Sequence, residues 1–275
     1  MVPTPTPHPR MMSDRRVPPG LTVVPGVDSL AADDGPLFAV VGVFDGLHVG
    51  HAYLLRHLVD EAARRSARPA VITFDHHPDE VIVGSAPPLL VDPDERVRLL
   101  GEAGVAVAIV QHFDAALRVT PYDAFIGRIT QRTRLAGLLM TPEAAFGHQR
   151  RGTPETLAAL GAESEPPFDV VVVPSFTLDG HPVSSSEIRR LVAAGDLAAG
   201  ARLLGRPLSV VGRAGAGGAV AFAMPMALPP PGAYPVSVEA VDDGGALSAI
   251  ANVEAGGRLV LDRMPWPDRA MRVVF

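Results

Sequence analysis

The chain contains no cysteine among its 275 residues. Disulfide bridges, thiolate nucleophiles and cysteine-based zinc sites are therefore excluded, and a chain without disulfides is expected in the cytoplasm. Lysine is missing as well, because all 24 basic residues are arginine. This absence excludes the phosphate-binding lysine of P-loop proteins and any catalysis through a lysine Schiff base.

Two further absences limit the partners. No run of about 18 apolar residues occurs, so no membrane span or membrane partner is expected. The net charge of −6, without a basic run, argues against nucleic acid but is compatible with small phosphorylated ligands. The first residues, MVPTPTPHPRMMSDRRVPPG, are rich in proline and lack the apolar stretch of a signal peptide. They predict a disordered tail over residues 1–20.

Apolar runs alternate with amphipathic segments along most of the chain. The run LFAVVGVF at 37–44 is typical of a parallel strand buried on both faces, and leucines at helical spacing predict a helix over 50–66. The same alternation predicts further strands at 70–74, 105–110, 135–140 and 169–174, and further helices at 94–103, 121–133, 153–161 and 185–204. Such βα units indicate a doubly wound, Rossmann-like parallel sheet, which binds ligands at the carboxyl ends of its strands.

The sequence changes character after residue 204. Glycine, proline and short β-like runs, such as AYPVSVEAV at 233–241 and GRLVLD at 257–262, follow the last predicted helix. We therefore predict an α/β domain over 21–204 and a small antiparallel β module over 205–275.

His48 and His51 lie between the first long strand and its helix. Residues three apart share a helix face, and a helix amino terminus offers free N–H groups and partial positive charge to a phosphate. Two imidazoles there could donate hydrogen bonds to a nucleoside triphosphate, while Gly46 and Gly50 allow a tight turn. Helix capping is the simpler alternative. A metal site is not expected, because the spacing places no third ligand for zinc beside the pair.

The segment GVFDGLHVGH at 42–51 resembles the GxFDGxHxGH signature of the nucleotidylyltransferase module in bacterial bifunctional riboflavin kinase/FAD synthetases. Three more segments resemble that family's TFDPHP, FGKxRxG and SSTxIR blocks in the same order: VITFDHHPDEVI at 71–82, FGHQRRG at 146–152 and VSSSEIRRLVAAGDLAAGARLLGRP at 183–207. The resemblance covers residues 21–213. It implies an HxGH nucleotidylyltransferase fold, followed by a truncated riboflavin kinase-like β-barrel.

The resemblance also implies an activity, in which the phosphate of FMN attacks the α-phosphorus of ATP to give FAD and pyrophosphate. The implied partners are ATP and FMN, or a related phosphorylated small molecule, with Mg²⁺ accompanying ATP as cofactor. The implied catalytic residues are His48, His51 and Arg189. The implied nucleotide-binding residues are Gly42, Phe44, Asp45, Gly46, Gly50, Ser184, Ser185 and Ser186, and the implied acceptor-binding residues are Asp75, His77, Pro78, Glu143 and Phe146. We expect His48, His51, Ser185 and Arg189 to converge at the carboxyl edge of the sheet.

Several of these residues have alternative roles. Asp45 could reach a Mg²⁺-bound water, orient its loop or simply stabilise a turn. The serines at 184–186 could cap a helix or donate to phosphate, and one hydroxyl can do both. Arg189 is expected to hold the β- and γ-phosphates from the side opposite the histidines.

The chain departs from the family pattern in two regions. In MTPEAAFG at 140–147, Glu143 and Ala144 replace the short polar and aromatic residues of a GxDF or GxNF pattern, and His76 replaces the proline of TFDPHP. We expect the longer, acidic Glu143 to alter acceptor binding. In the β module, AGAGGAVAFAMPMALPPPGAY at 214–234 replaces the kinase flap and PTAN motif, so riboflavin kinase activity is expected to be lost. Transfer to a different phosphorylated acceptor, and flavin or nucleotide binding with little catalysis, remain alternative functions.

Overall fold

A six-stranded parallel sheet forms the first part of the computed structural model, which describes residues 18–241, 245–263, 266 and 269–275. Its strand order is β1-β4-β3-β2-β5-β6. The strands are β1 (Thr22–Val24), β2 (Leu37–Val41), β3 (Arg68–Phe74), β4 (Val107–Gln111), β5 (Leu135–Met140) and β6 (Asp169–Val172). The predicted parallel α/β sheet is confirmed. The predicted tail lies outside the described residues up to residue 17.

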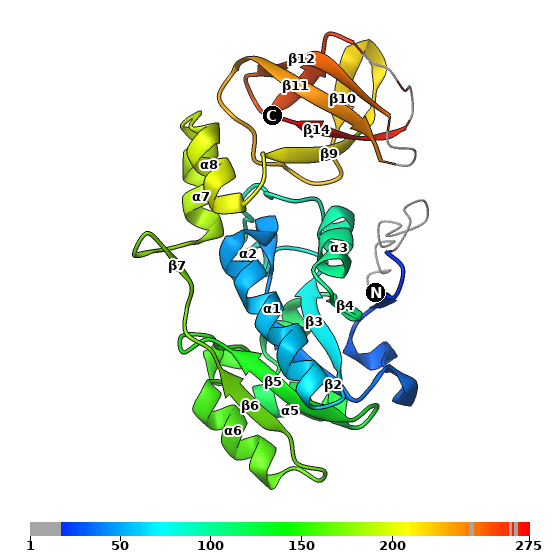
Figure 1. Ribbon diagram of the computed structural model, residues 1–275, viewed down its shortest axis with the longest axis vertical. Coiled ribbons are helices and arrows are strands. Elements are labelled where there is room, and N and C mark those ends of the chain that lie inside the picture. The colour runs from blue at the N-terminus through cyan, green and yellow to red at the C-terminus, as the bar shows by residue number, and fades with distance from the viewer. Residues whose placement is uncertain (1–17, 242–244, 264–265, 267–268) are drawn as a thin grey trace, which may run out of the picture.

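Helices follow most of these strands, as the alternation predicts (Figure 1). They are α1 (Val49–Arg64), α2 (Asp79–Ile82), α3 (Pro93–Glu102), α4 (Ala115–Arg118), α5 (Tyr122–Thr130), α6 (Pro154–Glu163), α7 (Ser185–Ala193) and α8 (Leu197–Leu204). A short hairpin, β7 (Thr177–Leu178) and β8 (His181–Pro182), precedes α7. Among the described residues, no helix combines the length and apolar character needed to cross a membrane.

The sheet is buried on both faces, because alternate residues of each strand enter different cores. Leu37 and Ala39 of β2 pack into one core together with side chains of α5 and α6. Phe38 and Val40 pack into the other core with side chains of α1 and α3. This two-sided burial explains why LFAVV reads as a continuous apolar run without alternation.

Strand β2 is shorter than predicted, because the chain turns sharply after Val41. Within the turn, Phe44 (φ 53°), Gly46 (φ 78°) and Leu47 (φ 38°) all have positive φ, which no strand tolerates. Residues 45–47 form a single 3₁₀ turn, after which His48 caps α1. The turn therefore delivers the two histidines to the start of α1.

The chain order also places a crevice at the centre of the sheet. From β2 the chain adds β3 and then β4 on one side, whereas β5 pairs with β2 on the other side and β6 follows it. The order thus reverses between β2 and β5. In doubly wound sheets, ligands bind outside the carboxyl ends of the strands at such a switch point.

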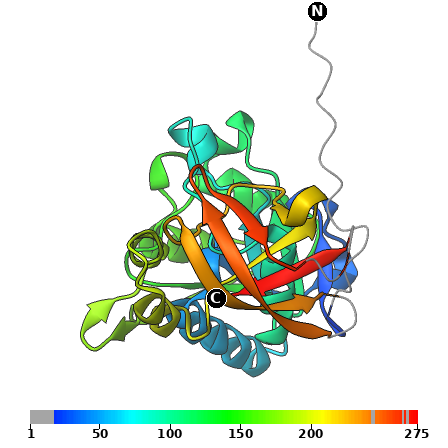
Figure 2. The same cartoon turned by 90° about the horizontal axis from the view of Figure 1, so that it is seen from above.

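The C-terminal part is a closed antiparallel barrel, which confirms the predicted β module (Figures 1 and 2). The strand order around the barrel is β10-β13-β12-β11-β14-β9. Its strands are β9 (Ser209–Ala214), β10 (Ala219–Ala221), β11 (Gly232–Ala240), β12 (Ala246–Glu254), β13 (Arg258–Leu261) and β14 (Ala270–Val274). Closure pairs the edges that an open sheet would expose.

A buried ion-pair cluster joins the barrel to the α/β unit. Glu95 on α3 is only 5% exposed, and its Oε1 lies 2.8 Å from Nη2 of Arg272 on β14 and 2.7 Å from Nη2 of Arg98. A backbone hydrogen bond also joins the two units, because the N–H of Leu89 donates to the Pro225 carbonyl at 2.8 Å. The two units are therefore bonded through both side chains and backbone.

We expect Glu95→Gln to lower the free energy of unfolding by about 3 kcal/mol, because it leaves the partly buried Arg272 without its more buried counter-charge. Glu102→Gln is the matched control, since Glu102 pairs with Arg98 from the exposed side of the same helix and should change stability by less than about 1 kcal/mol. Urea unfolding measures both values. Equal effects of the two substitutions would contradict the account of this interface.

Candidate active site

The turn after β2 is organised around Asp45, whose side chain is only 2% exposed. Its Oδ1 accepts hydrogen bonds from the N–H groups of Leu90 at 3.0 Å and Val91 at 3.1 Å. Its Oδ2 lies 2.6 Å from Nη2 of Arg189. Both carboxylate oxygens are therefore used within the protein.

This bonding favours one of the alternatives for Asp45. A magnesium ligand needs an oxygen that can turn toward the ion, and both oxygens of Asp45 are held by donors. Asp45 is also the only carboxylate in the sequence from Gly42 to His51. The turn therefore offers no free carboxylate oxygen for direct ligation of Mg²⁺, and the contacts that Asp45 makes all orient its loop.

Two sequence blocks that lie far apart along the chain meet at this turn. The Ser185 hydroxyl donates to the backbone carbonyl of Asp45 at 2.9 Å, across 140 positions of sequence. Arg189, one helical turn further along α7, also donates from Nε to the Pro88 carbonyl at 2.8 Å. Ser184 caps α7 by accepting from the N–H of Glu187. The structure thus brings Ser185 and Arg189 against the turn that precedes His48.

The two histidines stack at the amino terminus of α1. Their ring centroids are 3.7 Å apart and the rings are inclined by 17°. His48 caps the helix, with its Nδ1 accepting from the N–H of His51 at 3.3 Å. A Cβ on Gly50 would lie 3.2 Å from the His48 ring, so glycine leaves the ring its space. Capping and phosphate binding are therefore compatible in this geometry.

The surroundings keep both imidazoles neutral. Burial, together with the positive charge of Arg206, lowers the pKa of His48 to about 4. Burial also holds the pKa of His51 well below its usual range, with His48 and Arg206 adding to the effect. Because Nδ1 of His48 accepts a hydrogen bond, its proton resides on Nε2. The pair can thus offer N–H donors at neutral pH without carrying charge.

Two arginines that were not among the expected site residues also hold the turn. Arg206 donates to the carbonyls of Gly46 at 2.7 Å and Leu47 at 3.2 Å. Arg96, which is 2% exposed, donates to the Val43 carbonyl at 3.1 Å and to the carbonyl at the end of β3. A signal for Arg96 exists in the sequence, since it lies four residues before Leu100 on the apolar face of α3.

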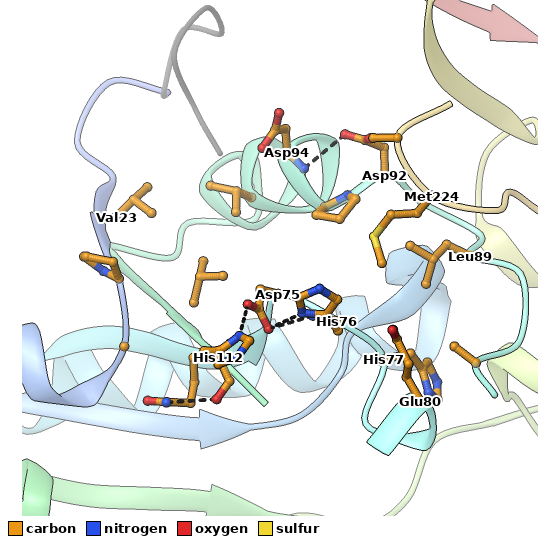
Figure 3. Close-up of a pocket in the computed structure, with 18 of the residues that line it drawn as sticks. Val23, Asp75, His76, His77, Glu80, Leu89, Asp92, Asp94, His112 and Met224 are labelled. Atoms are coloured by element: carbon orange, nitrogen blue, oxygen red, sulfur yellow. Dashed lines mark hydrogen bonds and ion pairs between the residues drawn. The ribbon is translucent and has the colours of Figure 1, made fainter. Parts of the chain in front are cut away.

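Two cavities adjoin this region. The smaller, of about 170 Å³, lies at the ends of β2 and β5, and its lining includes Gly42, Phe44, His51, Ala144 and Phe146. The larger, of about 1040 Å³, lies between the sheet and the barrel, and its lining includes Asp75, His77, Leu89 and Met224 (Figure 3). The expected acceptor-binding residues therefore do not share one cavity. Asp75 and His77 line the larger cavity, Phe146 lines the smaller one, and Pro78 and Glu143 line neither.

Glu143 lies on the surface. It is exposed, and its Oε2 accepts a hydrogen bond from the Ser175 hydroxyl at 2.6 Å, which lowers the pKa of the carboxyl group. Its neighbour Ala144 lines the smaller cavity.

His77 is held by its own loop. Its Nδ1 accepts from the N–H of Asp79 at 3.3 Å, and burial lowers the pKa of His77.

The neutrality of His48 predicts a specific loss of stability in acid. In the unfolded chain a histidine takes up a proton near pH 6.5, whereas folded His48 does so only near pH 4. The contribution of neutral His48 to the free energy of unfolding is therefore fully present above about pH 6.5, and it is lost as the pH falls to about 4. Between about pH 7 and pH 4.5, unfolding free energy should fall by roughly 2 to 3 kcal/mol more in the wild type than in His48→Gln. Parallel pH profiles would show that His48 is not held neutral.

The comparisons with known proteins agree on a family. The family model for FAD synthetase matches residues 31–187. A bifunctional riboflavin kinase/FMN adenylyltransferase of Haemophilus influenzae is 34% identical over 177 residues, covering 63% of this chain and 56% of that protein. A protein of the same description from Pseudomonas fluorescens is 28% identical over 244 residues, covering 85% of this chain and 77% of that protein.

The fold also has a solved counterpart. A crystal structure described as a macrolide-efflux protein from Streptococcus pneumoniae superimposes with a TM-score of 0.77 at 21% identity, covering 92% of this chain and 89% of that one. The chain spans only about half the length of several curated relatives that it matches. The matched family model nevertheless spans more than half of the chain, and the protein belongs to the FAD synthetase family.

Proposed function

We propose that the protein is an FMN adenylyltransferase, which joins FMN to the AMP part of ATP and releases pyrophosphate. The observation that carries this proposal is the meeting of the HxGH turn and the serine–arginine block at Asp45, which brings together the two distant segments that we propose to bind phosphate. The family membership supports the same reaction. Such a transfer requires no covalent enzyme intermediate, so positioning and electrostatic stabilisation supply most of the rate.

The histidine pair is proposed to hold the triphosphate. His48 and His51 stack at the start of a 16-residue helix, where N–H groups and the helix dipole favour phosphate. Neutral N–H donors fixed in one geometry stabilise the negative charge that develops as pyrophosphate leaves. Because the rings are held by the cap and by stacking, they need little reorganisation during the reaction.

Arg189 is proposed to bind phosphate through Nη1, the guanidinium nitrogen that is not used in hydrogen bonds with the described residues. Its Nε and Nη2 are bonded to Pro88 and Asp45, whereas Nη1 has no hydrogen bond to the described part of the chain. A guanidinium held in one plane in this way suits a phosphate oxygen geometrically. The hydroxyl hydrogen of Ser185 is used on Asp45, so Ser185 is proposed to position the turn and not to donate to phosphate.

The acceptor is proposed to lie over the carboxyl edge between the loops that follow β3 and β5. Ile82 at the end of α2 and Val83 directly after it are exposed by 44% and 68%, and Phe146 and Ala144 line the smaller cavity. Apolar surface of this kind suits a flat flavin ring. Glu143, exposed at the edge of this region, is proposed to influence the acceptor from the rim.

We further propose that riboflavin kinase activity is lost. The stretch that replaces the PTAN motif is used for a different purpose, because Met226 forms a bridge with Leu89 and Ala227 donates its N–H to the Leu89 carbonyl at 2.8 Å. Met226 and Ala227 are both buried. The backbone of this stretch is therefore committed to the contact with the α/β unit, and no Thr–Asn pair is present in it to hold Mg²⁺–ATP.

The test is FAD formation from FMN, ATP and Mg²⁺ by the purified chain. We expect FAD and pyrophosphate in equal amounts, and a fall in turnover of roughly a hundredfold or more in His51→Ala, because one transition-state donor is lost. His57→Ala is the control, since His57 lies on the same helix and its ring contacts Tyr53. It should leave turnover unchanged.

Each alternative has its own outcome in this assay. Pyrophosphate release with other phosphorylated acceptors, but not with FMN, would assign a different acceptor. Binding of ATP or FMN without turnover would indicate a binding protein, and near-normal turnover in His51→Ala would reduce His51 to a structural residue. Conversion of riboflavin to FMN in the presence of ATP would refute the loss of kinase activity.

A further inference from the structure

We propose that Asp75, His76 and His112 form a binding site for one divalent transition-metal ion, for which Zn²⁺ is the best match. The site lies in the larger cavity, between the sheet and the barrel (Figure 3). It is separate from the phosphate-binding turn, and the proposal does not depend on the proposed adenylyl transfer.

The three side chains come from neighbouring strand ends. Asp75 and His76 directly follow β3, and His112 directly follows β4, which pairs with β3 in parallel. One potential ligand atom from each residue lies within 4.8 Å of the other two. Oδ2 of Asp75 is 2.6 Å from Nδ1 of His112, and the two imidazole centroids are 5.6 Å apart. The set is therefore assembled before any ion enters.

The carboxylate of this set is already oriented by the backbone. Oδ1 of Asp75 accepts from the N–H of His76 at 2.8 Å and from the N–H of Phe113 at 3.2 Å. Hydrogen bonds of this kind fix a metal-binding carboxylate in position. Oδ2 faces Nδ1 of His112, and Oδ1 lies beside Nδ1 of His76.

His76 supplies a second, independent observation. Its Nδ1 is buried 2.9 Å from Oδ1 of Asp75, yet it lacks an aligned hydrogen bond with any described residue. A buried ring nitrogen whose nearest partner is poorly aligned is only partly satisfied, and such a group in a folded protein calls for an explanation. Coordination to a metal ion would satisfy this nitrogen.

The donor types select the metal. Two imidazoles and one carboxylate suit zinc and similar transition metals, whereas Mg²⁺ and Ca²⁺ prefer oxygen ligands. Tetrahedral zinc with bonds of about 2.1 Å places its ligand atoms about 3.4 Å apart, so shifts of roughly an ångström would complete the site. Glu80 and Asp94 also line the cavity, and their charges favour a cation there.

Three protein ligands leave a coordination position for water or a small anion. The cavity of about 1040 Å³ around the cluster gives that position room. His76 stands where the TFDPHP motif of the family has proline, so the site is a feature of this sequence and not of the motif. The apolar side chains that line the same cavity include Leu89 and Met224.

The experiment is a metal titration of the full chain after treatment with a chelator. We expect one Zn²⁺ per chain by calorimetry, and visible absorption bands of a four-coordinate complex when Co²⁺ is used as the probe. Loss of a residue that only hydrogen-bonds to a metal ligand typically lowers metal affinity about 10- to 100-fold. His76 and His112 are proposed as direct ligands, so His76→Ala and His112→Ala should each weaken Zn²⁺ binding by at least about 100-fold. His181→Ala is the control, since His181 is exposed on the hairpin of β7 and β8.

His112→Gln serves as a second variant, because it retains a polar partner for Asp75 but should still lose the Co²⁺ bands. Thermal unfolding without metal identifies any variant that fails to fold. The proposal is overturned if the wild type binds no Zn²⁺, or if the His76→Ala/His112→Ala double variant retains full affinity. The proposal is also overturned if His48→Ala abolishes binding while the variants at His76 and His112 do not. The ion would then bind at His48 and His51.

Discussion

The buried carboxylate of Asp45 is the interaction on which the proposed site depends. A carboxylate at 2% exposure is stable only when its lost hydration is replaced. Two backbone N–H groups and the guanidinium of Arg189 replace it here, and each comes from a different part of the chain than the turn itself. Asp45 can stay buried only while these partners remain in contact with it. Its burial therefore fixes the positions of the turn, the segment before α3 and the start of α7 relative to one another.

The constraint passes from Asp45 to the histidines through the strained turn. Phe44 and Leu47 adopt positive φ, which costs free energy in residues other than glycine and persists only where the surroundings enforce it. Arg206 helps to hold the turn in this conformation by donating hydrogen bonds to the carbonyls of Gly46 and Leu47. Its positive charge also lowers the pKa of His48. One arginine thus shapes the turn and keeps its imidazole neutral.

Much of this arrangement could be predicted from the sequence, because it rests on local patterns. The run LFAVV, the leucine spacing of α1 and the apolar run of β5 identify buried strands and helices directly, and the four motif blocks bring the same residues to notice. The end of β2 was harder, since Gly42 to Phe44 continue the apolar pattern while the backbone turns. The closure of the barrel depends on β12, whose alternating small residues give a weak strand signal.

The roles of charged groups were the least predictable part. Arg189 and Asp45 both appear in motifs, but no local pattern shows that they pair across 144 positions, or that Ser185 donates to the Asp45 backbone. Arg96 and Arg206 were not among the expected site residues, because the helical spacing that places Arg96 on an apolar face does not show which carbonyls a buried arginine binds. His76 and His112 are 36 positions apart and meet only because β3 and β4 are neighbours.

The central claim is that the Asp45–Arg189 pair couples the two sequence blocks proposed to bind phosphate into one unit. A double-mutant cycle with Asp45→Asn, Arg189→Gln and the combined variant measures this coupling directly from urea unfolding. Because the two groups share one buried network, the combined loss of stability should differ from the sum of the single losses by about 2 kcal/mol. Additive losses, within about 0.5 kcal/mol, would show that the two blocks are held in place independently and would contradict the account.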